Sequence, residues 1–151
     1  MKNYLLDTNI LLLYLRGDSR MAHINNLYNP FSVDSKPIVS VVTVGEIHSI
    51  ALQRHWGLSK IADLNRFLNK FLIADINVRP IIDAYAEIDA FSQNKLASNP
   101  LGMTARSMGK NDLWIAATAH VLKLPLLTTD KDFHHLKDTY LDLAFIDLMA
   151  I

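Results

Sequence analysis

Four acidic residues stand where the sequence changes from one kind of segment to another. Asp7 follows a short apolar run, and Glu46 follows a β-branched one. Asp112 begins an apolar segment with helical spacing, and Asp130 follows the run Leu-Leu-Thr-Thr. Carboxylates are the ligands that Mg²⁺ and Mn²⁺ prefer. If the fold brings these acids together, they could therefore support metal-assisted chemistry.

Each acid also has an ordinary structural explanation as a helix cap. An Asp at a helix start accepts hydrogen bonds from free N–H groups and meets the positive end of the helix dipole. Thr43 and Glu46 have the spacing of a capping box, which would place Glu46 at the third helical position. Taken singly, each acid is better explained as a cap than as a ligand.

Two features of the sequence favour a ligand role nevertheless. Asp7 is followed by Thr8 and Asn9, which are themselves good capping groups, so capping alone does not require an acid there. Glutamate is rare in the chain, which has only Glu46 and Glu87, and the first of them comes directly after the most strand-like segment.

The order of the segments predicts an α/β fold. We expect strands at residues 4–6, 38–42, 71–76, 124–128 and 141–146. We expect helices at residues 9–16, 19–28, 43–55, 59–71, 80–97 and 111–123, with loops at 29–37 and 98–110. This alternation indicates βαβ units and a parallel sheet with helices on both faces. The carboxyl ends of the strands then share one edge, where Asp7, Glu46 and Asp130 would project.

Several carboxylates at one edge need a compensating charge. Two of them about 5 Å apart repel by roughly 3 kcal/mol at an effective dielectric near 20. Hard divalent cations would neutralise them, and two such ions suit phosphodiester hydrolysis, because they activate water and stabilise an in-line transition state. The chain has no cysteine, which excludes thiolate ligands and cysteine nucleophiles.

The composition limits the number of domains and the classes of function that the chain can have. A chain of 151 residues is expected to form one domain, residues 1–151. The 15 basic and 15 acidic residues give no net charge, which argues against general electrostatic wrapping of nucleic acid. The first residues make a poor secretory signal, and no apolar run reaches the ~18 residues of a membrane span, so we expect a cytoplasmic protein with no membrane association. The six histidines show no metal-binding spacing and are expected to be surface or packing residues.

Four short motifs carry a family resemblance that covers nearly the whole chain. They are Leu-Leu-Asp-Thr-Asn at 5–9, Val-Ser-Val-Val-Thr-Val-Gly-Glu-Ile at 39–47, Gly-Lys-Asn-Asp-Leu-Trp-Ile-Ala-Ala-Thr-Ala at 109–119, and Leu-Leu-Thr-Thr-Asp-Lys-Asp-Phe at 126–133. In order and spacing the sequence resembles the PIN-domain ribonucleases, and most closely the VapC-type toxins of toxin–antitoxin pairs.

The resemblance implies a three-layer sandwich with a central parallel sheet of about five strands. It implies that Asp7, Glu46, Asp112 and Asp130 are catalytic and hold one or two Mg²⁺ or Mn²⁺ ions. The activity it implies is that of a metal-dependent nuclease, an endoribonuclease that hydrolyses RNA, often transfer or ribosomal RNA. A cognate VapB-like antitoxin and a homodimer are the partners that it implies.

Further residues are expected near the site. Asn9 and Thr128 stand where the family places polar groups that orient the ligands, a role common to metal sites. Asp132 has the spacing of a fifth acid, or caps the short segment that follows it. Arg106 and Lys110 are candidates for contact with RNA phosphates, which would position the substrate without reading its sequence.

Two other functions fit parts of the sequence. One is a phosphatase or phosphotransferase with Asp7 as nucleophile, but such enzymes of the haloacid-dehalogenase type use a second Asp where this chain has Asn9. The other is a PIN-like domain that binds without catalysis, and the presence of all four acids speaks against it.

Overall fold

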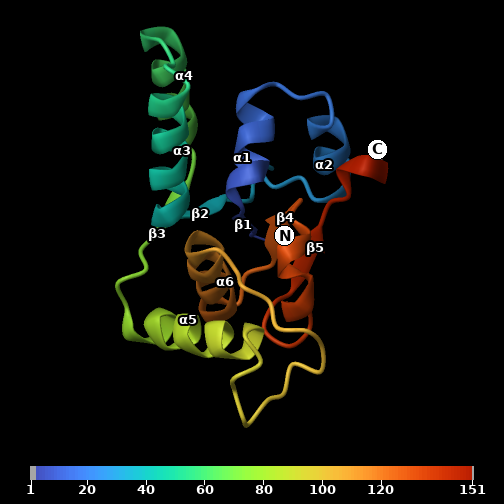
Figure 1. Ribbon diagram of the computed structural model, residues 1–151. Coiled ribbons are helices and arrows are strands. Elements are labelled where there is room, and N and C mark those ends of the chain that lie inside the picture. Colours follow the sequence, from blue (N-terminus) through green and yellow to red (C-terminus); the bar gives the residue numbers. More distant parts are fainter. Residues whose placement is uncertain (1–2, 151) are drawn as a thin grey trace.

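Five parallel strands form the centre of the structure, a computed structural model that describes residues 3–150 (Figure 1). The strands are β1 (Leu5–Leu6), β2 (Ile38–Ser40), β3 (Leu72–Ala74), β4 (Leu126–Thr128) and β5 (Leu143–Phe145). Their order across the sheet is β3-β2-β1-β4-β5, and every pairing is parallel. All strands therefore end at the same edge, with β1 at the centre.

The sheet divides the core into two hydrophobic clusters. Neighbouring residues of a strand point to opposite faces. In β1, Leu5 packs into one cluster and Leu6 into the other. Their partners across the sheet follow the same division, since Leu126 joins the cluster of Leu5 and Leu127 that of Leu6. All four leucines are fully buried, as is typical of parallel strands covered on both faces.

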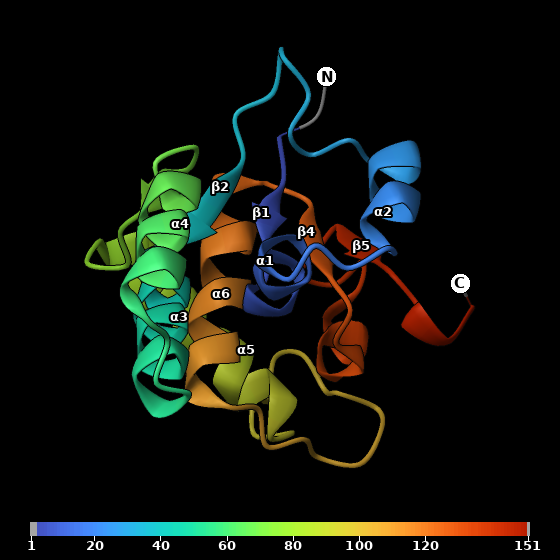
Figure 2. The ribbon, with the colours of Figure 1, turned by 90° about the horizontal axis from the view of Figure 1, so that it is seen from above.

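Helices cover both faces. The cluster that contains Leu6 is covered by α1 (Thr8–Leu15), α2 (Met21–Leu27), α3 (Val41–Gln53) and α4 (Leu58–Leu68). The cluster that contains Leu5 is covered by α5 (Arg79–Ser92) and α6 (Lys110–Leu122), with the 3₁₀ helix η1 (Lys131–Leu136) beside them. A second 3₁₀ helix, η2 (Leu148–Ala150), ends the described chain. Figure 2 shows α3 and α4 side by side at the β2 side of the sheet. The predicted three-layer fold with a five-stranded parallel sheet is confirmed.

Helix α3 begins two residues earlier than the sequence predicts. Ser40 is its N-cap, and the Ser40 hydroxyl accepts a hydrogen bond from the Val42 backbone N–H at 3.1 Å. Because serine caps helices well, the β-branched pair after it belongs to the helix and not to the strand. The predicted capping box is therefore wrong: Thr43 lies inside the helix, and Glu46 is beyond its first turn.

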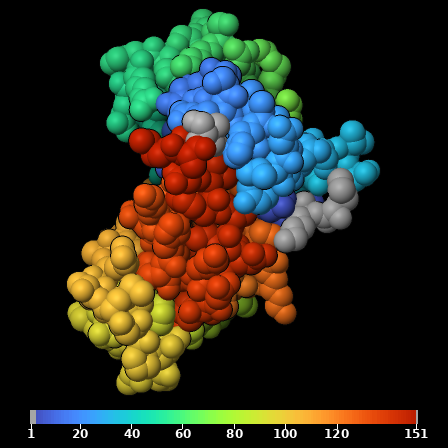
Figure 3. Space-filling model, turned by 90° about the vertical axis from the view of Figure 1, so that its right-hand side faces the viewer, coloured from blue at the N-terminus to red at the C-terminus, as the bar shows by residue number. Residues whose placement is uncertain are grey.

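The other helix boundaries also differ from prediction by one to five residues, and two of these differences have an identifiable cause. Helix α6 begins at Lys110 with Gly109 as its N-cap, so Asp112 lies in the first turn and does not cap the helix. Helix α5 ends at Ser92, because Asn94 has a left-handed backbone with φ 57° and its side chain accepts a hydrogen bond from the Leu101 N–H at 3.1 Å. The loop that follows lies at the opposite end of the molecule from α3 and α4 (Figures 1 and 3). Within residues 3–150, no helix has the length and apolar character needed to cross a membrane.

Candidate metal centre

Asp7 lies where the central strand β1 ends and α1 begins. It is the N-cap of α1, and its Oδ1 accepts a hydrogen bond from the Thr8 N–H at 2.8 Å. Its Oδ2 accepts a second hydrogen bond, from the Thr128 hydroxyl at 2.7 Å. The residue is only 3% exposed. Asp7 is thus a cap and a buried carboxylate at once, and both oxygens are held in fixed directions.

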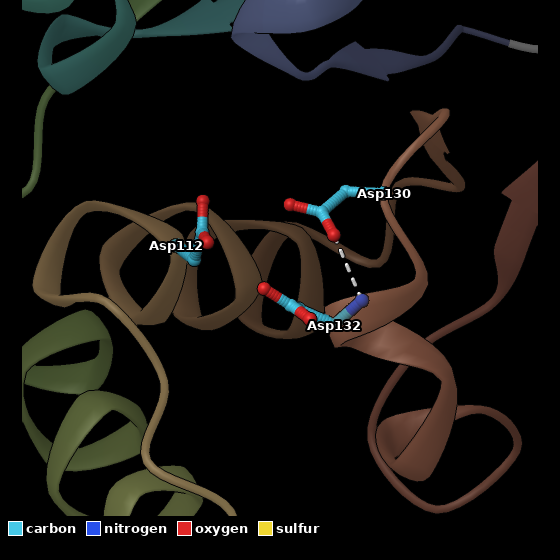
Figure 4. Close-up of side chains that lie close together, drawn as sticks. All are labelled: Asp112, Asp130 and Asp132. Atoms are coloured by element: carbon cyan, nitrogen blue, oxygen red, sulfur yellow. Dashed lines mark hydrogen bonds between the residues drawn. The ribbon is translucent and has the colours of Figure 1, made fainter.

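Three further carboxylates gather beside this strand edge. Asp112, Asp130 and Asp132 each offer an oxygen, and these oxygens all lie within 4.8 Å of one another. Asp112 comes from the first turn of α6, Asp130 follows β4, and Asp132 lies in the first turn of η1. Figure 4 shows the three side chains around a common space, with Asp112 approaching from α6 and the other two from the segment after β4. Among the described residues, no other set of three or more acids or histidines lies so close together.

Thr128 links Asp7 to this group of three carboxylates. Its hydroxyl donates to Asp7 and also accepts a hydrogen bond from the Asp130 N–H at 3.0 Å. Asp130 in turn is the N-cap of η1, and its Oδ1 accepts from the Asp132 N–H at 2.9 Å. One buried hydroxyl therefore fixes the ends of β1 and β4 relative to each other, and a side-chain cap fixes η1 relative to both.

Glu46 is held by two threonines. The Thr8 hydroxyl donates to Glu46 Oε1 at 2.8 Å, and the Thr8 and Thr43 hydroxyl oxygens lie 3.1 Å apart. A hydroxyl has one proton, so Thr43 must donate to Thr8 while Thr8 donates to the carboxylate. This chain of hydrogen bonds joins α1 to α3 and orients Glu46 toward the strand edge.

The carboxylates destabilise each other's charged forms. Burial, and then the negative charge of Asp7, raise the pKa of Asp112 to about 7, with smaller contributions from Asp130, Glu46 and Asp132. Burial also raises the pKa of Asp7 to about 6, although the hydrogen bonds from Thr128 and Thr8 oppose the shift. Asp130 and Glu46 add to it. The five acids thus act on each other through their charges, and this repulsion favours the binding of a proton or a cation among them.

No basic side chain forms an ion pair with these five acids in the part of the chain that the structure describes. The ion pairs found there are Asp18–Arg20, Asp63–Arg66 and Arg79–Asp83, and all three lie outside the acidic centre. A set of carboxylate oxygens without a basic partner has the donor chemistry of a Mg²⁺ or Mn²⁺ site. The residues present therefore fit a divalent cation.

The structure brings some of the predicted site residues together and leaves others apart. Asp112, Asp130 and Asp132 come together directly, and Asp7 and Glu46 act on Asp112 through their charge. Asn9 is exposed, and its side chain makes no hydrogen bond to the acids within the described residues. The hydroxyl that contacts Glu46 belongs instead to Thr8, for which the sequence indicates only a capping role.

The two candidate RNA-contact residues are both exposed. Lys110 is the first residue of α6, two positions before Asp112. Arg106 lies in the loop after α5, and its backbone N–H donates to the Ser92 carbonyl at 2.7 Å, which ties this part of the loop to α5. Both side chains are accessible to a ligand from solvent.

Comparison with known proteins agrees with the fold. A model of the PIN domain matches residues 4–138, and the chain belongs to this family. No curated protein sequence matches it significantly. The fold is similar to VapBC2 of Rickettsia felis, bound to a promoter DNA fragment, at TM-score 0.72 and 20% identity over 95% of this chain and 98% of that one. It is similar to VapBC-1 of nontypeable Haemophilus influenzae at TM-score 0.74 and 23% identity, over 94% and 96% of the two chains. It is also similar to FitAcB of Neisseria gonorrhoeae at TM-score 0.68 and 22% identity, over 95% and 96%.

Proposed function

We propose that this PIN-domain protein is an endoribonuclease that hydrolyses RNA with the help of Mg²⁺ or Mn²⁺. The observation that carries the proposal is the meeting of Asp112, Asp130 and Asp132 within 4.8 Å, at the strand edge where Asp7 is buried. Ionised carboxylates this close together repel each other, and the repulsion raises their pKa values. A divalent cation bound between them would offset the repulsion. A bound cation activates water and stabilises the charge that develops on a phosphodiester during in-line displacement.

Asp7, Glu46, Asp112 and Asp130 are the residues that would hold the cation, with Asp132 as a fifth ligand. Thr128 orients Asp7, and Thr8 orients Glu46, through the hydrogen bonds described above. Both hydrogen bonds are present in the structure without a cation, so they would hold the two carboxylates in place before one binds.

Arg106 and Lys110 would contact the RNA backbone. Both side chains are exposed, and neither forms an ion pair within residues 3–150. Cationic side chains of this kind bind phosphate oxygens and position a nucleic acid without selecting its sequence. They would also offset the repulsion between the acidic site and the phosphates.

Burial of Asp7 argues against the phosphatase alternative. An aspartate nucleophile needs a free oxygen that can reach a phosphorus atom. Both oxygens of Asp7 accept hydrogen bonds, and the residue is 3% exposed. This burial disfavours attack by Asp7 on a phosphorus atom, whereas each hydrogen-bonded oxygen keeps a second lone pair that could face a cation, as we propose.

The direct test is cleavage of RNA by the purified protein with Mg²⁺ or Mn²⁺. We expect Asp112→Asn and Asp7→Ala to lower the rate by about two orders of magnitude or more, because each removes a cation ligand. Asp83→Asn is the matched control, since Asp83 is an exposed carboxylate on α5 that pairs with Arg79. Equal rates for wild type and the two site variants, with all proteins folded, would contradict the assignment.

We further propose that the protein is the toxin of a VapBC-type pair, which forms a homodimer and is inhibited by a VapB-like antitoxin. The support is the similarity in fold to VapBC complexes over nearly the whole chain. Induced expression should arrest growth, and co-expression of a small adjoining gene should relieve the arrest, with its product copurifying. Growth arrest that the Asp112→Asn variant causes equally well would speak against a toxic nuclease.

A further inference from the structure

A groove of about 480 Å³ runs along α3 beside the acidic centre. Its floor is one face of α3 from Val42 to Gln53, and its wall includes Asn111 at the start of α6. Glu46 belongs both to this groove and to the acidic centre, and Asn111 directly precedes Asp112. The groove is therefore continuous with the place where a phosphodiester would be cleaved, and its volume is in the range of small-ligand sites.

Gly45 keeps this groove open. It lies inside α3, where glycine is one of the least favourable residues, and its φ is not positive. A Cβ built at Gly45 meets no atom within 4 Å. Neither backbone conformation nor close packing within the chain thus requires glycine here. Open space above a helical glycine allows a ligand to approach the backbone closely.

The groove offers hydrogen bonds without positive charge. Ser49, Gln53 and Asn111 are exposed and uncharged, while Val42 and Ile50 are half-buried and apolar. The Gln53 side-chain N–H donates to the Ser49 hydroxyl at 2.9 Å, which fixes the amide and leaves its oxygen and the Ser49 proton available. Among the described residues that line the groove there is no lysine or arginine, so its chemistry does not suit a phosphate.

We propose that this α3 groove is a subsite for one unpaired base of the RNA, next to the bond that is cleaved. The proposal rests on the proposed ribonuclease function and adds a substrate feature to it. Single-stranded bases are recognised by hydrogen bonds to their edges and by apolar contact with their faces. Amide and hydroxyl groups beside two aliphatic side chains supply both kinds of contact. The base in the groove would select the cleavage site, while the acids act on the adjoining phosphate.

The test is cleavage of a single-stranded RNA library with a randomised stretch, followed by sequencing of the new ends. The variants are Gln53→Ala, Ser49→Ala and Gly45→Leu. His48→Ala and His48→Leu are matched controls, because His48 is exposed on the same helix but faces a different groove with Leu52 and Trp56. Asp112→Asn shows whether any cleavage depends on the acidic centre.

We expect wild type and the His48 variants to prefer one base at a fixed position beside the cut. Gln53→Ala and Ser49→Ala should reduce that preference roughly tenfold, because a hydrogen-bonded base contact is lost. Gly45→Leu should slow cleavage of all sequences roughly tenfold by filling the groove, and should keep or raise the melting temperature, since leucine favours the helix.

Three results would overturn the subsite. If wild type cleaves but all three groove variants keep its rate and base preference, the base does not bind there. If a groove variant changes the oligomeric state in size-exclusion chromatography, the groove is an interface between copies of the chain. If wild type shows no cleavage that depends on Asp112 and a divalent cation, the ribonuclease function itself fails, and the subsite fails with it.

Discussion

The Thr128 hydroxyl donates a 2.7 Å hydrogen bond to Asp7 Oδ2, across 121 positions of the sequence. The two residues follow neighbouring strands, β1 and β4, which pair through Leu5 and Leu126. The same hydroxyl accepts from the Asp130 N–H. A single buried side chain thus sets the distance and direction between two proposed cation ligands, so its removal should affect the site more than the fold.

Thr128→Val should weaken Mn²⁺ binding by about tenfold or more, as loss of a hydrogen bond to a metal ligand commonly does. The substitution keeps the side-chain volume, and isothermal titration calorimetry would measure the affinity. Thr118→Val is the control, because Thr118 is equally buried but its hydroxyl donates to the Trp114 carbonyl within α6. Equal Mn²⁺ affinity in the two variants would show that Thr128 does not position Asp7.

Thr8→Val should lower the cleavage rate by about tenfold, because Glu46 loses the hydroxyl that orients it. Thr43 also loses its acceptor, so the free energy of unfolding should fall by roughly 1–2 kcal/mol. Thr8→Ser keeps the hydroxyl and should retain most of the activity. Rates and urea unfolding curves of both variants check this, and a Ser variant as slow as the Val variant would point to packing as the cause.

The sheet and its acidic edge could be predicted from the sequence, because both depend on local pattern. Short apolar or β-branched runs alternate with helical segments, and Asp7 and Asp130 come directly after such runs. Parallel strands end at one edge, so both acids could be expected there. That they lie near each other depends on the pairing of β1 with β4, which the sequence does not show. The start of α3 was predicted incorrectly because Val41 and Val42 continue the β-branched run, while the capping strength of Ser40 decides the boundary.

The pairing of Thr8 with Glu46 could not be predicted in the same way. It joins residues 38 positions apart and depends on how α1 packs against α3. One signal was available: Thr43 and Glu46 are three positions apart and so share a helix face. The place of Asp132 also depends on tertiary structure, because the first turn of η1 directs it toward Asp112 and Asp130.

Divalent cations should stabilise the protein against heat. A cation present at a hundredfold excess over its dissociation constant adds about 2.7 kcal/mol to the free energy of unfolding. For a chain of this size the melting temperature should rise by roughly 5–10 °C. Differential scanning fluorimetry with Mn²⁺, against NaCl of equal ionic strength, measures the shift. The double variant Asp112→Asn/Asp130→Asn should lose it, and an equal shift in that variant would place the bound cation elsewhere.

Without a cation, the stability of the protein should fall as pH rises from about 4 to 7. An aspartate in an unfolded chain has a pKa near 3.9, whereas the pKa values of Asp7 and Asp112 in the fold are raised to about 6 and about 7. Folding therefore takes up protons in this window. The stability contributed by the protonated carboxyls is complete below pH ~4 and is lost as pH rises through the folded pKa values.

Asp112→Asn imitates the protonated carboxyl and so tests this dependence on pH. In EDTA at pH 7.5 it should raise the melting temperature by roughly 3–6 °C, or about 1–2 kcal/mol after allowance for solvent screening. At pH 4.5 the same rise should be several-fold smaller, because Asp112 is then protonated in the folded protein, as the variant imitates, and pH 4.5 is only slightly above the pKa near 3.9 of the unfolded carboxyl. Asp83→Asn, which changes an exposed carboxylate on α5 outside the acidic centre, is the control. Calorimetry at the two pH values checks this. If the variant's melting temperature differs from that of wild type by the same amount at both, the charge of Asp112 does not oppose folding.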